Sequence, residues 1–574
     1  MDANHWSGAH LKRSRLIGLV SALVFSVAAH ADNITSEETP RYGGKLDIGT
    51  VHYTLAALSW DMSDWVWKTN HDTGLVREQL FAGDLTKSVS RGGRFPFRAE
   101  AYIPTDAMRG ELAESWDWED DNTLVIQLRR DVMFPTRPGV METRELDAKD
   151  VVYSYYNIEG SPKKVTGYYD YIALVEARDT HTVVFHFNEY NAEWQYRYGY
   201  GFHSAIIPRE TAKVDAKDWR NVMGTGPFNL TRYIDSNVQT YARNDDYWDT
   251  ERLAGADHRL PYLDEIHYRV IKDESTILTA LRTGKLDILE SIRWLAVDHL
   301  KETTPELKWS RWLATSGLFM AMRMDKKPFD DVRVRRAINL AVNQQEIVDL
   351  FYGGHAELMA YPQHPGFDAY YQPLSEMPAS VQELFAYNPD KAKRLLAEAG
   401  YPDGFSFKVQ VCTCSPNEMD LVPLLEDYLS KIGVSVEIVP MEYAAFLSVM
   451  TTRNHELGYL MQSGHTNPTT SIRKSLITGH PWNPSQFSDP AMDEAIKQML
   501  LERDEGKRVE MVRAMTIEML DRAPYLWLPT EYIYTAWWPW VKNYGGELRA
   551  GAQRPGPIYA RIWMDQALKR ELGF

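Results

Sequence analysis

The residue types that could support catalysis or metal binding occur at several places, but none of these groupings completes a motif. His455 and Glu456 begin a zinc-protease H-E-x-x-H pattern, yet the next position of the pattern is Tyr459, so the second histidine ligand is missing. Residues 224–227, Gly-Thr-Gly-Pro, lack the third glycine and the Lys-Ser/Thr pair of a phosphate-binding loop. Neither pattern predicts an enzyme.

Three other candidates also fall short. No Gly-x-Ser-x-Gly elbow for a nucleophilic serine follows residue 31. His181 and His186 lie five residues apart on a predicted strand and so face opposite sides, which argues against a shared nickel site. Paired carboxylates such as Asp120-Asp121 would cleave glycosidic bonds only if two of them converged in one pocket. We therefore expect no metal and no cofactor, and a secreted hydrolase is the less favoured alternative.

The chain that must position any site is too long to fold around a single hydrophobic core. A chain of 574 residues predicts about three to four domains. The formal net charge is −16, which argues against nucleic acid or an anionic membrane face as the main partner. The 32 Tyr, 18 Trp and 19 Phe can be explained by core packing, or by a cleft whose rings grip a ligand.

The first residues are predicted to be a signal peptide. Basic residues at positions 12–15 precede an apolar run of 14 residues, Leu16 to Ala29, which ends in Ala-His-Ala. The run is short for a membrane span, so we expect secretion with cleavage after Ala31. Removing residues 1–31 takes away three basic residues and Asp2, which lowers the net charge from −16 to −18.

The two cysteines, Cys412 and Cys414, are separated by one residue. On an extended strand, this spacing holds the backbone atoms of the two cysteines at a fixed separation that is poor for a disulfide, so a mutual disulfide is not expected. The sequence predicts buried or unreactive thiols.

Residues 112–152 combine several local signals. An acidic turn at residues 119–121 precedes a predicted strand with Leu124, Ile126 and Leu128 on one face. A helix is predicted to start at Asp147, which caps its free amides, with Asp150 in the first turn. Residues 182–187 predict another strand, with Val183, Phe185 and Phe187 on one face.

The later part of the chain predicts an α/β arrangement. Residues 328–348 favour a helix with its three arginines on a solvated or ion-paired face, namely Arg333, Arg335 and Arg336. Asn388 and Pro389 predict the start of a helix that Gly400 ends. An alternating strand at residues 407–411, a helix at 421–432 and a strand at 434–438 form a unit of the kind that crosses over between parallel strands.

Several ordered strings together resemble one protein family. The strings are L-A-E-S-W, the acidic turn, L-R-x-x-V-x-F, A-x-D-V-x-x-S, G-T-G-P-F, P-F-D-D-V-R-V-R-R-A-I-N-L-A-V and L-L-A-E-A-G-Y-P-D-G-F. They resemble the substrate-binding proteins of bacterial ABC importers of the oligopeptide, dipeptide and nickel class, extracellular solute-binding protein family five (cluster C). The resemblance covers nearly the whole chain after residue 31.

The resemblance implies an α/β protein with the two-lobed periplasmic binding protein fold (type II) and an extra inserted α/β domain. It predicts a discontinuous first lobe at residues 41–58, 203–314 and 522–574, an insertion at 59–202 and a second lobe at 315–521. It also implies a monomer in the periplasm that delivers its solute to an inner-membrane ABC permease and its ATPase, without enzymatic activity.

The resemblance also suggests site residues. Peptide binders of the family place an aspartate four residues before a proline, where it pairs with the ammonium group of the ligand. The matching position here is Gly464, so an ordinary free peptide becomes less favoured unless the register shifts. A non-peptide solute, such as an oligosaccharide or an opine, is the alternative. The candidate ligand-binding residues are Gly464, His465, Thr466 and Asn467 in the second lobe, His52 and Tyr53 in the first, and Tyr168 and Tyr169 in the insertion.

Two further roles remain open. A hydrolase would act on a peptide or glycan in the same cleft, and a receptor subunit would present the solute to a sensor partner. Peptide or peptide-like solute transport is the favoured function.

Overall fold

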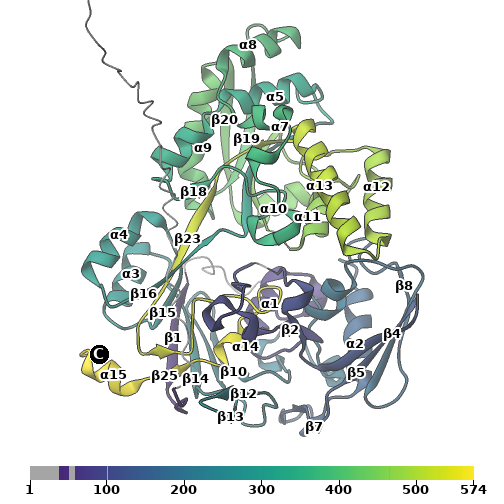
Figure 1. Cartoon of the computed structure of the whole chain (residues 1–574), viewed down its shortest axis with the longest axis vertical. Helices are drawn as coiled ribbons and strands as arrows, with labels where there is room; N and C mark the ends of the chain where they lie inside the picture. Colours follow the sequence, from purple (N-terminus) through teal and green to yellow (C-terminus); the bar gives the residue numbers. More distant parts are fainter. Residues whose placement is uncertain (1–37, 51–58, 100, 465) are drawn as a thin grey trace, which may run out of the picture. The chain divides into compact units, whose positions relative to one another are not determined.

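A computed structural model of the chain describes residues 38–50, 59–99, 101–464 and 466–574, which build three larger β-sheets with helices packed on them (Figure 1). The predicted signal peptide, residues 1–31, lies outside the described residues, as do His52, Tyr53 and His465. Within the described ranges, every helix is too short or too polar to cross a lipid bilayer.

The largest sheet has eight strands and draws on both ends of the chain. Its strand β1 pairs in parallel with β14 and β15, so the carboxyl ends of these three strands lie at one edge. The remaining pairs along the sheet are antiparallel. The strands, in spatial order, are β10 (Phe228–Ile234), β11 (Val238–Arg243), β14 (Glu265–Val270), β1 (Lys45–Thr50), β15 (Ile288–Ile292), β23 (Thr530–Trp537) and β16 (Lys308–Leu313), with β18 (Ala356–Glu357) paired to β23.

The second sheet has five strands and carries the predicted α/β unit. β19 pairs in parallel with β20 and β21, and α9 (Pro416–Ser430) packs on β19 and β20. Phe407, Val409 and Val411 of β19 are buried, which confirms the predicted alternation. The strands, in spatial order, are β20 (Val434–Met441), β19 (Phe405–Cys412), β21 (Gly458–Gly464), β17 (Ser316–Met322) and β22 (Tyr525–Trp527).

The chain passes between these two sheets from β16 to β17 and from β22 back to β23, and between β17 and β19 it also returns to the eight-stranded sheet through the short strand β18. The segments that join β16 to β17 and β22 to β23, called here the crossing segments, are hydrogen-bonded to each other across the sheet boundary. The Ala314 amide donates to the Glu531 carbonyl at 2.9 Å, and the Leu528 amide donates to the Leu318 carbonyl at 3.3 Å. The pair therefore forms a two-stranded connection between the sheets.

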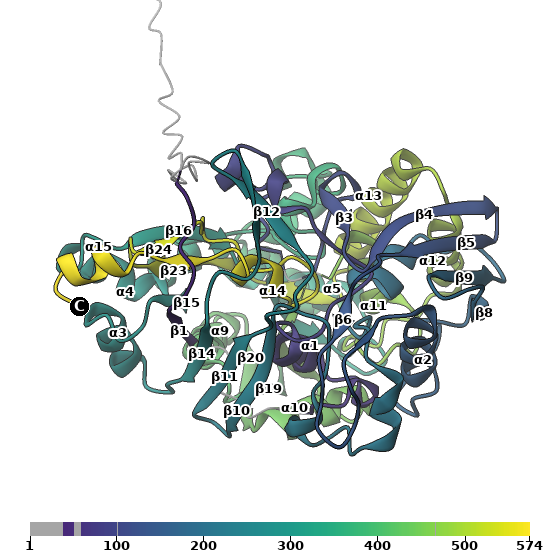
Figure 2. The ribbon, with the colours of Figure 1, turned by 90° about the horizontal axis from the view of Figure 1, so that it is seen from below.

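The third sheet is antiparallel and lies against α2 (Ala148–Glu159), as Figure 2 shows. Leu124, Ile126 and Leu128 are buried on one face, which confirms that prediction. The Asp147 side chain accepts from the Lys149 amide, and Asp150 accepts from the Asp147 amide, so the predicted helix start is confirmed as a capping box. The strand order is β4 (Ala113–Asp120), β5 (Thr123–Leu128), β9 (Thr182–Phe187) and β8 (Ile172–Ala177).

The helix predicted after Asn388 is confirmed as α8 (Pro389–Glu398). Asn388 accepts from the Lys391 amide at 3.0 Å, and Gly400 follows with a φ of +93°. The other α-helices of four or more residues in the described ranges are α1 (Trp67–Thr73), α3 (Glu274–Arg282), α4 (Trp294–Thr303), α5 (Val332–Ala341), α7 (Ala379–Gln382), α10 (Tyr443–Thr451), α11 (Pro468–Leu476), α12 (Pro490–Leu501), α13 (Glu505–Arg522), α14 (Gly556–Tyr559) and α15 (Gln566–Glu571).

Two local predictions are wrong. Arg335 of α5 is 3 % exposed instead of solvated, because its guanidinium donates to the carbonyls of Phe329 and Arg522 at 2.7 and 2.8 Å. Cys412 and Cys414 form a disulfide, because their Cα atoms are only 5.1 Å apart once the chain turns out of β19 after Cys412.

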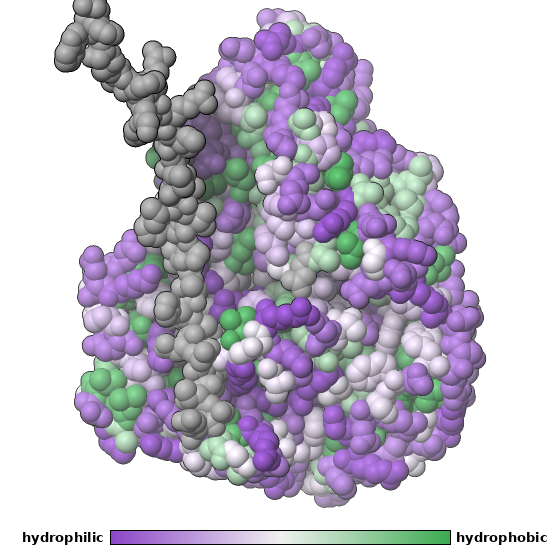
Figure 3. All heavy atoms as spheres, in the orientation of Figure 1, coloured by the Kyte–Doolittle hydropathy of each residue, from purple (hydrophilic) through white to green (hydrophobic). Residues whose placement is uncertain are grey.

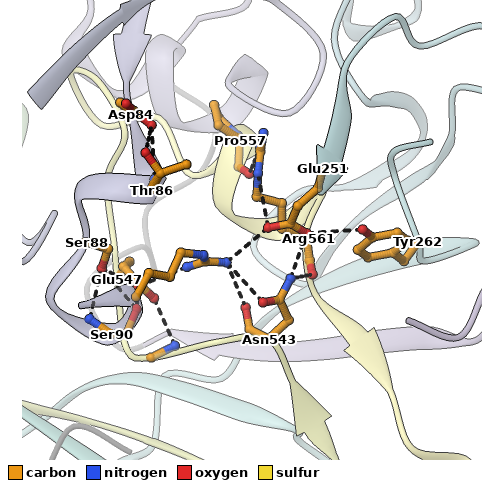
Figure 4. A network of polar contacts seen from close by, with 12 residues as sticks. Asp84, Thr86, Ser88, Ser90, Glu251, Tyr262, Asn543, Glu547, Pro557 and Arg561 are labelled. Atoms are coloured by element: carbon orange, nitrogen blue, oxygen red, sulfur yellow. Dashed lines mark hydrogen bonds and ion pairs between the residues drawn. The ribbon is translucent and has the colours of Figure 1, made fainter. Parts of the chain in front are cut away.

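Polar networks join distant segments around the eight-stranded sheet (Figure 4). Asn543 donates to Glu251 at 2.8 Å and to the Arg561 carbonyl at 2.8 Å. Arg91 forms ion pairs with Glu251 and Glu547 at 3.4 and 3.3 Å. The C-terminal segment is thereby fastened to parts of the chain hundreds of residues earlier. Figure 3 shows that hydrophilic residues cover much of one face, with hydrophobic residues in scattered groups.

Candidate functional site

The predicted site segments follow the carboxyl ends of parallel strands. β21 ends at Gly464 and is followed by residues 465–467, and β1 ends at Thr50 immediately before residues 51–53. In open α/β sheets, ligands bind in the crevice outside the carboxyl ends of the strands. β1 and β21 therefore end at sheet edges of the kind that bind ligands, and His52, Tyr53 and His465 themselves lie outside the described residues.

Two of the described residues of the segment 464–467 form hydrogen bonds with α11. Asn467 caps this helix, because its Oδ1 accepts from the Thr470 amide and from the Thr469 hydroxyl, both at 2.8 Å. The Gly464 carbonyl accepts from Lys474 Nζ. Thr466 Oγ1 is buried and has no hydrogen-bond partner in the part of the chain that the structure describes. Asn467 Oδ1 thus serves the helix, and Thr466 keeps an oxygen that a ligand can use.

One carboxylate, that of Glu193, joins the segment after β9 to α11. Its Oε1 accepts from the hydroxyls of Thr469 and Thr470 at 3.1 and 2.6 Å. Its Oε2 lies 2.7 Å from Arg197 Nη2 and 2.9 Å from Arg473 Nη2. Burial alone would raise the pKa of Glu193, but the guanidinium groups of Arg473 and Arg197 lower it to about 2. Glu193 is therefore ionised throughout the physiological pH range.

Tyr168, one of the two predicted ring contacts, lies beside this cluster. The guanidinium carbon of Arg197 is 3.6 Å from the centre of its ring, and that of Arg473 is 4.3 Å away. These distances are those of cation–π contacts. The structure therefore brings Tyr168 together with α11, the helix that follows residue 467.

Tyr169 points into the insertion instead. It is 5 % exposed and lies against Trp65 and Tyr198, with ring centres 5.9 and 6.0 Å away. It lines a small cavity of about 30 Å³ together with Arg197 and His203. That volume suits one or two water molecules rather than a solute. Core packing accounts for the described contacts of Tyr169.

Two histidines near the cluster are held neutral. Burial, followed by the charges of Arg473 and Arg197, lowers the pKa of His480 to about 3. Burial and Arg197 lower the pKa of His203 to about 3. Neither side chain adds positive charge at neutral pH, so the cations among the described residues of this region are Arg197, Arg473 and Lys474.

A pair of buried acids, Glu418 and Glu531, lies between α9 and β23. Burial raises the pKa of Glu418 to about 8, with the neighbouring carboxyl of Glu531 adding to the shift. Burial also raises the pKa of Glu531 to about 7, although a hydrogen bond from Asn417, at 2.5 Å, opposes the shift. α9 packs on the five-stranded sheet, and β23 is a strand of the eight-stranded sheet. The two acids therefore lie at the boundary between these sheets.

A buried polar network joins α1 to β11 of the eight-stranded sheet. Lys68 Nζ contacts both carboxyl oxygens of Asp72 at 2.6 Å, and Gln239 of β11 donates to the same carboxylate at 3.3 Å. Tyr241 donates to the Asp72 carbonyl at 2.7 Å. These contacts fix α1 against the eight-stranded sheet.

The Gly-Thr-Gly-Pro segment has a packing role. A Cβ on Gly224 would lie 2.1 Å from the Val76 carbonyl oxygen, so the backbones approach too closely for a side chain. The Thr225 hydroxyl donates to Glu78 at 2.8 Å. Across the described ranges, no three or more His, Cys, Asp or Glu side chains are grouped so that they could hold a metal ion.

The sequence analysis missed the charged residues of the site. Glu193, Arg197, Arg473 and Lys474 were not among the candidates, although one signal was present in the sequence. Glu193 and Arg197 have the i,i+4 spacing of a helical ion pair, whereas the burial of Arg473 and Lys474 on α11 is seen only in the structure.

Solved structures with the same fold include periplasmic binding proteins. The protein DppA from Helicobacter pylori, solved in complex with the peptide STSA, has a TM-score of 0.75 at 22% identity, over 92% of this chain and 99% of that one. The protein AgaA from A. tumefacien R10, solved with agropinic acid, has a TM-score of 0.72 at 19% identity, over 91% and 99%. The fold is that of the two-lobed binding proteins.

Sequence comparison defines the family. Residues 107–482 match the family described as bacterial extracellular solute-binding proteins, family 5 Middle. Relatives include a dipeptide-binding protein of Escherichia coli, 26% identical over 534 residues that cover 87% of this chain and 95% of the relative. A di/tripeptide-binding protein of Pseudomonas aeruginosa is 26% identical over 441 residues, 72% and 79% of the two chains. This chain belongs to family 5 of the bacterial extracellular solute-binding proteins.

Proposed function

We propose that this protein captures a peptide or peptide-like solute in the periplasm and delivers it to an inner-membrane ABC permease with its ATPase. The observation that carries the proposal is the family match over residues 107–482, together with relatives named as dipeptide-binding and di/tripeptide-binding proteins. The protein acts as a binding protein, not as an enzyme. It is secreted through a signal peptide that is cleaved after Ala31, and it works as a monomer.

The proposed mechanism is closure of the two lobes around the solute. The crossing segments at Ala314 and Leu528 form the hinge, and contacts such as Glu193 with α11 form on closure. A solute that bonds to both lobes stabilises the closed form, and the permease recognises that form. Micromolar affinity, about −8 kcal/mol, requires only a well-buried solute with a few paired polar groups.

The domain division of the sequence analysis is part of the proposal, with one lobe at residues 41–58, 203–314 and 522–574, the insertion at 59–202 and the other lobe at 315–521. The pairing of β22 with β17 supports moving the last boundary to about residue 528. The proposed ligand-binding residues are Gly464, His465, Thr466 and Asn467, facing His52, Tyr53 and Tyr168. The packing of Tyr169 makes it the weakest member of the set.

A non-peptide solute is the second candidate. The AgaA structure contains an opine, agropinic acid, in the same fold. The position matched to the ammonium-binding aspartate is Gly464, which also favours a solute other than an ordinary free peptide. A hydrolase and a sensor subunit remain less favoured.

Native mass spectrometry of the protein purified from its own periplasm tests the proposal. We expect one bound small molecule whose addition to ligand-free protein reduces the radius of gyration in small-angle scattering. A bound molecule that leaves the scattering curve unchanged would contradict closure. Hydrolysis of the molecule over several hours would favour the hydrolase.

A further inference from the structure

The region around α11 carries more positive than negative charge. Residues 463–476 include Arg473 and Lys474 but no Asp or Glu. All nine residues of α11 are buried, so both cations are removed from bulk solvent. Arg197 of the insertion adds a third cation, and its described ion pair is to Glu193. Arg473 pairs with the same carboxylate. Two buried guanidinium groups therefore share one acid.

Several donors in this cluster lack a hydrogen-bond acceptor in the part of the chain that the structure describes. Among the described residues, Arg473 Nε and Nη2 have no hydrogen-bond partner, although Nη2 lies 2.9 Å from Glu193 Oε2 as an ion pair. Arg473 as a whole is 3 % exposed. The Thr466 hydroxyl is also buried without a partner in the described chain. Buried guanidinium donors without an acceptor are unfavourable, so an oxygen-bearing anion would complete this arrangement.

The helix reinforces the preference for an anion. α11 begins at Pro468, immediately after the predicted ligand-binding segment, and the positive end of its dipole faces that segment. Glu193 already occupies part of this end through Thr469 and Thr470. An ammonium group brought here would face three cations and one carboxylate. A carboxylate brought to the same place would be attracted by the three cations and repelled only by the one carboxylate, so its net interaction with the cluster would be favourable.

We propose that the subsite formed by Thr466, Arg473 and Arg197 binds a carboxylate of the solute, so that the protein selects peptide-like molecules that carry an acid in place of a free α-ammonium group. This inference rests on the proposed function, because it assigns a ligand class to the same site. The carboxylate accepts from Arg473 Nε and from the Thr466 hydroxyl, while Glu193 continues to orient the two arginines. Recognition by charge and by planar paired donors gives the site its specificity.

Isothermal titration calorimetry with three matched compounds tests the inference. The compounds are Ala-Phe, N-acetyl-Ala-Phe and N-succinyl-Ala-Phe, which present an ammonium, a neutral and a carboxylate group on one scaffold. We expect the succinyl compound to bind at least tenfold more tightly than the acetyl compound, and the free dipeptide to bind most weakly. Equal affinity of the succinyl and acetyl compounds, or tighter binding of the free dipeptide, would overturn the carboxylate subsite and leave the proposed peptide function standing.

Failure of all three compounds to bind would overturn both the subsite and the peptide-like function. Two variants locate the effect within the protein. Arg473→Gln should reduce the preference for succinyl over acetyl at least tenfold. Thr466→Val, which keeps the charge and the ion pair with Glu193, should reduce it about threefold. Arg503→Gln is the matched control, because Arg503 contacts Trp118 and Tyr190 instead. An unchanged preference in Thr466→Val and in a folded Arg473→Gln protein would refute the placement.

Discussion

At the scale of single residues, the contact between the insertion and α11 depends on Glu193. Replacing it by Gln keeps the shape of the side chain but leaves Arg197 and Arg473 without their shared carboxylate. We expect Glu193→Gln to lower the free energy of unfolding by about 2 to 3 kcal/mol, because removing one partner of a buried ion pair leaves an uncompensated charge. Urea unfolding measures the change. The exposed Glu119→Gln variant, whose partner is Arg178, should show no measurable loss.

The same residue sets a pH dependence. The pKa of Glu193 is about 2 in the folded protein and 4.5 as its ordinary value. A lowered pKa contributes stability that is complete above about pH 4.5 and is lost as the pH falls toward 2. We expect the difference in stability between wild type and Glu193→Gln to shrink over this window. A difference that is constant from pH 6 to pH 3 would show that the ionised carboxylate is not its source.

Asn467 and His465 provide a residue-scale prediction for binding. Replacing both by Ala should weaken solute binding at least tenfold, because two polar groups of the proposed segment are lost. Asn467→Ala also removes the cap of α11, at a cost of about 1 kcal/mol of stability. Asn388→Ala removes the equivalent cap of α8 and serves as the control, since it should cost similar stability without changing affinity.

At this scale, the sequence placed only part of the site. Asn467 and Tyr168 were both candidates, and the structure places Tyr168 against Arg473 of the helix that Asn467 caps. Glu193 and Arg473 are 280 residues apart, and their pairing exists only in the folded chain. Charged residues are usually exposed, so their types alone did not indicate burial. The pattern of residues within one segment does not predict which acidic residue forms an ion pair with which basic residue far away in the sequence.

At the scale of elements, α9 and β23 predict a second pH effect. The pKa of Glu418 is raised to about 8 and that of Glu531 to about 7. Between about pH 4.5 and pH 8 the folded protein holds more protons than the unfolded chain, so stability falls as the pH rises. Glu418→Gln removes one of these groups and should stabilise the protein at pH 8 by an amount of order 1 kcal/mol. Thermal unfolding from pH 5 to pH 8 measures the slope.

The expected slope for Glu418→Gln is flatter than that of wild type. Glu437→Gln changes an exposed carboxylate on β20 and should keep the wild-type slope. If Glu418→Gln also keeps that slope, Glu418 is ionised in the folded protein without cost, and the boundary between α9 and β23 is not sensitive to pH.

The elements themselves were predicted well where local signals agree. Capping predicted the start of α2 and of α8, and alternation predicted β5, β9 and β19, because these features depend on neighbours in the sequence. The errors at Arg335 and at Cys412 have tertiary causes. The carbonyls that surround Arg335 come from residue 522 and from the preceding loop, and the turn after β19 sets the distance between the cysteines.

At the scale of the whole molecule, two kinds of contact join the five-stranded sheet and the helices α11 and α12 to the rest of the chain. The hydrogen bonds at Ala314 and Leu528 lie in the crossing segments and involve only the backbone. The contacts of Glu193 with Thr470 and of the Ala192 amide with the Leu500 carbonyl, at 2.7 Å, instead join the segment after β9 to α11 and α12. If the lobes close around a solute, only the second kind should depend on it.

Hydrogen exchange on solute-bound and solute-free protein distinguishes these two kinds of contact. We expect removal of the solute to speed exchange at residues 190–200 and 466–476, because local opening there no longer has to break bonds to the ligand. The amides of Ala314 and Leu528 should exchange at unchanged rates, since their partners stay in place when a hinge rotates. A uniform increase over both regions would mean that the solute stabilises the fold as a unit, and that the crossing segments do not act as a hinge.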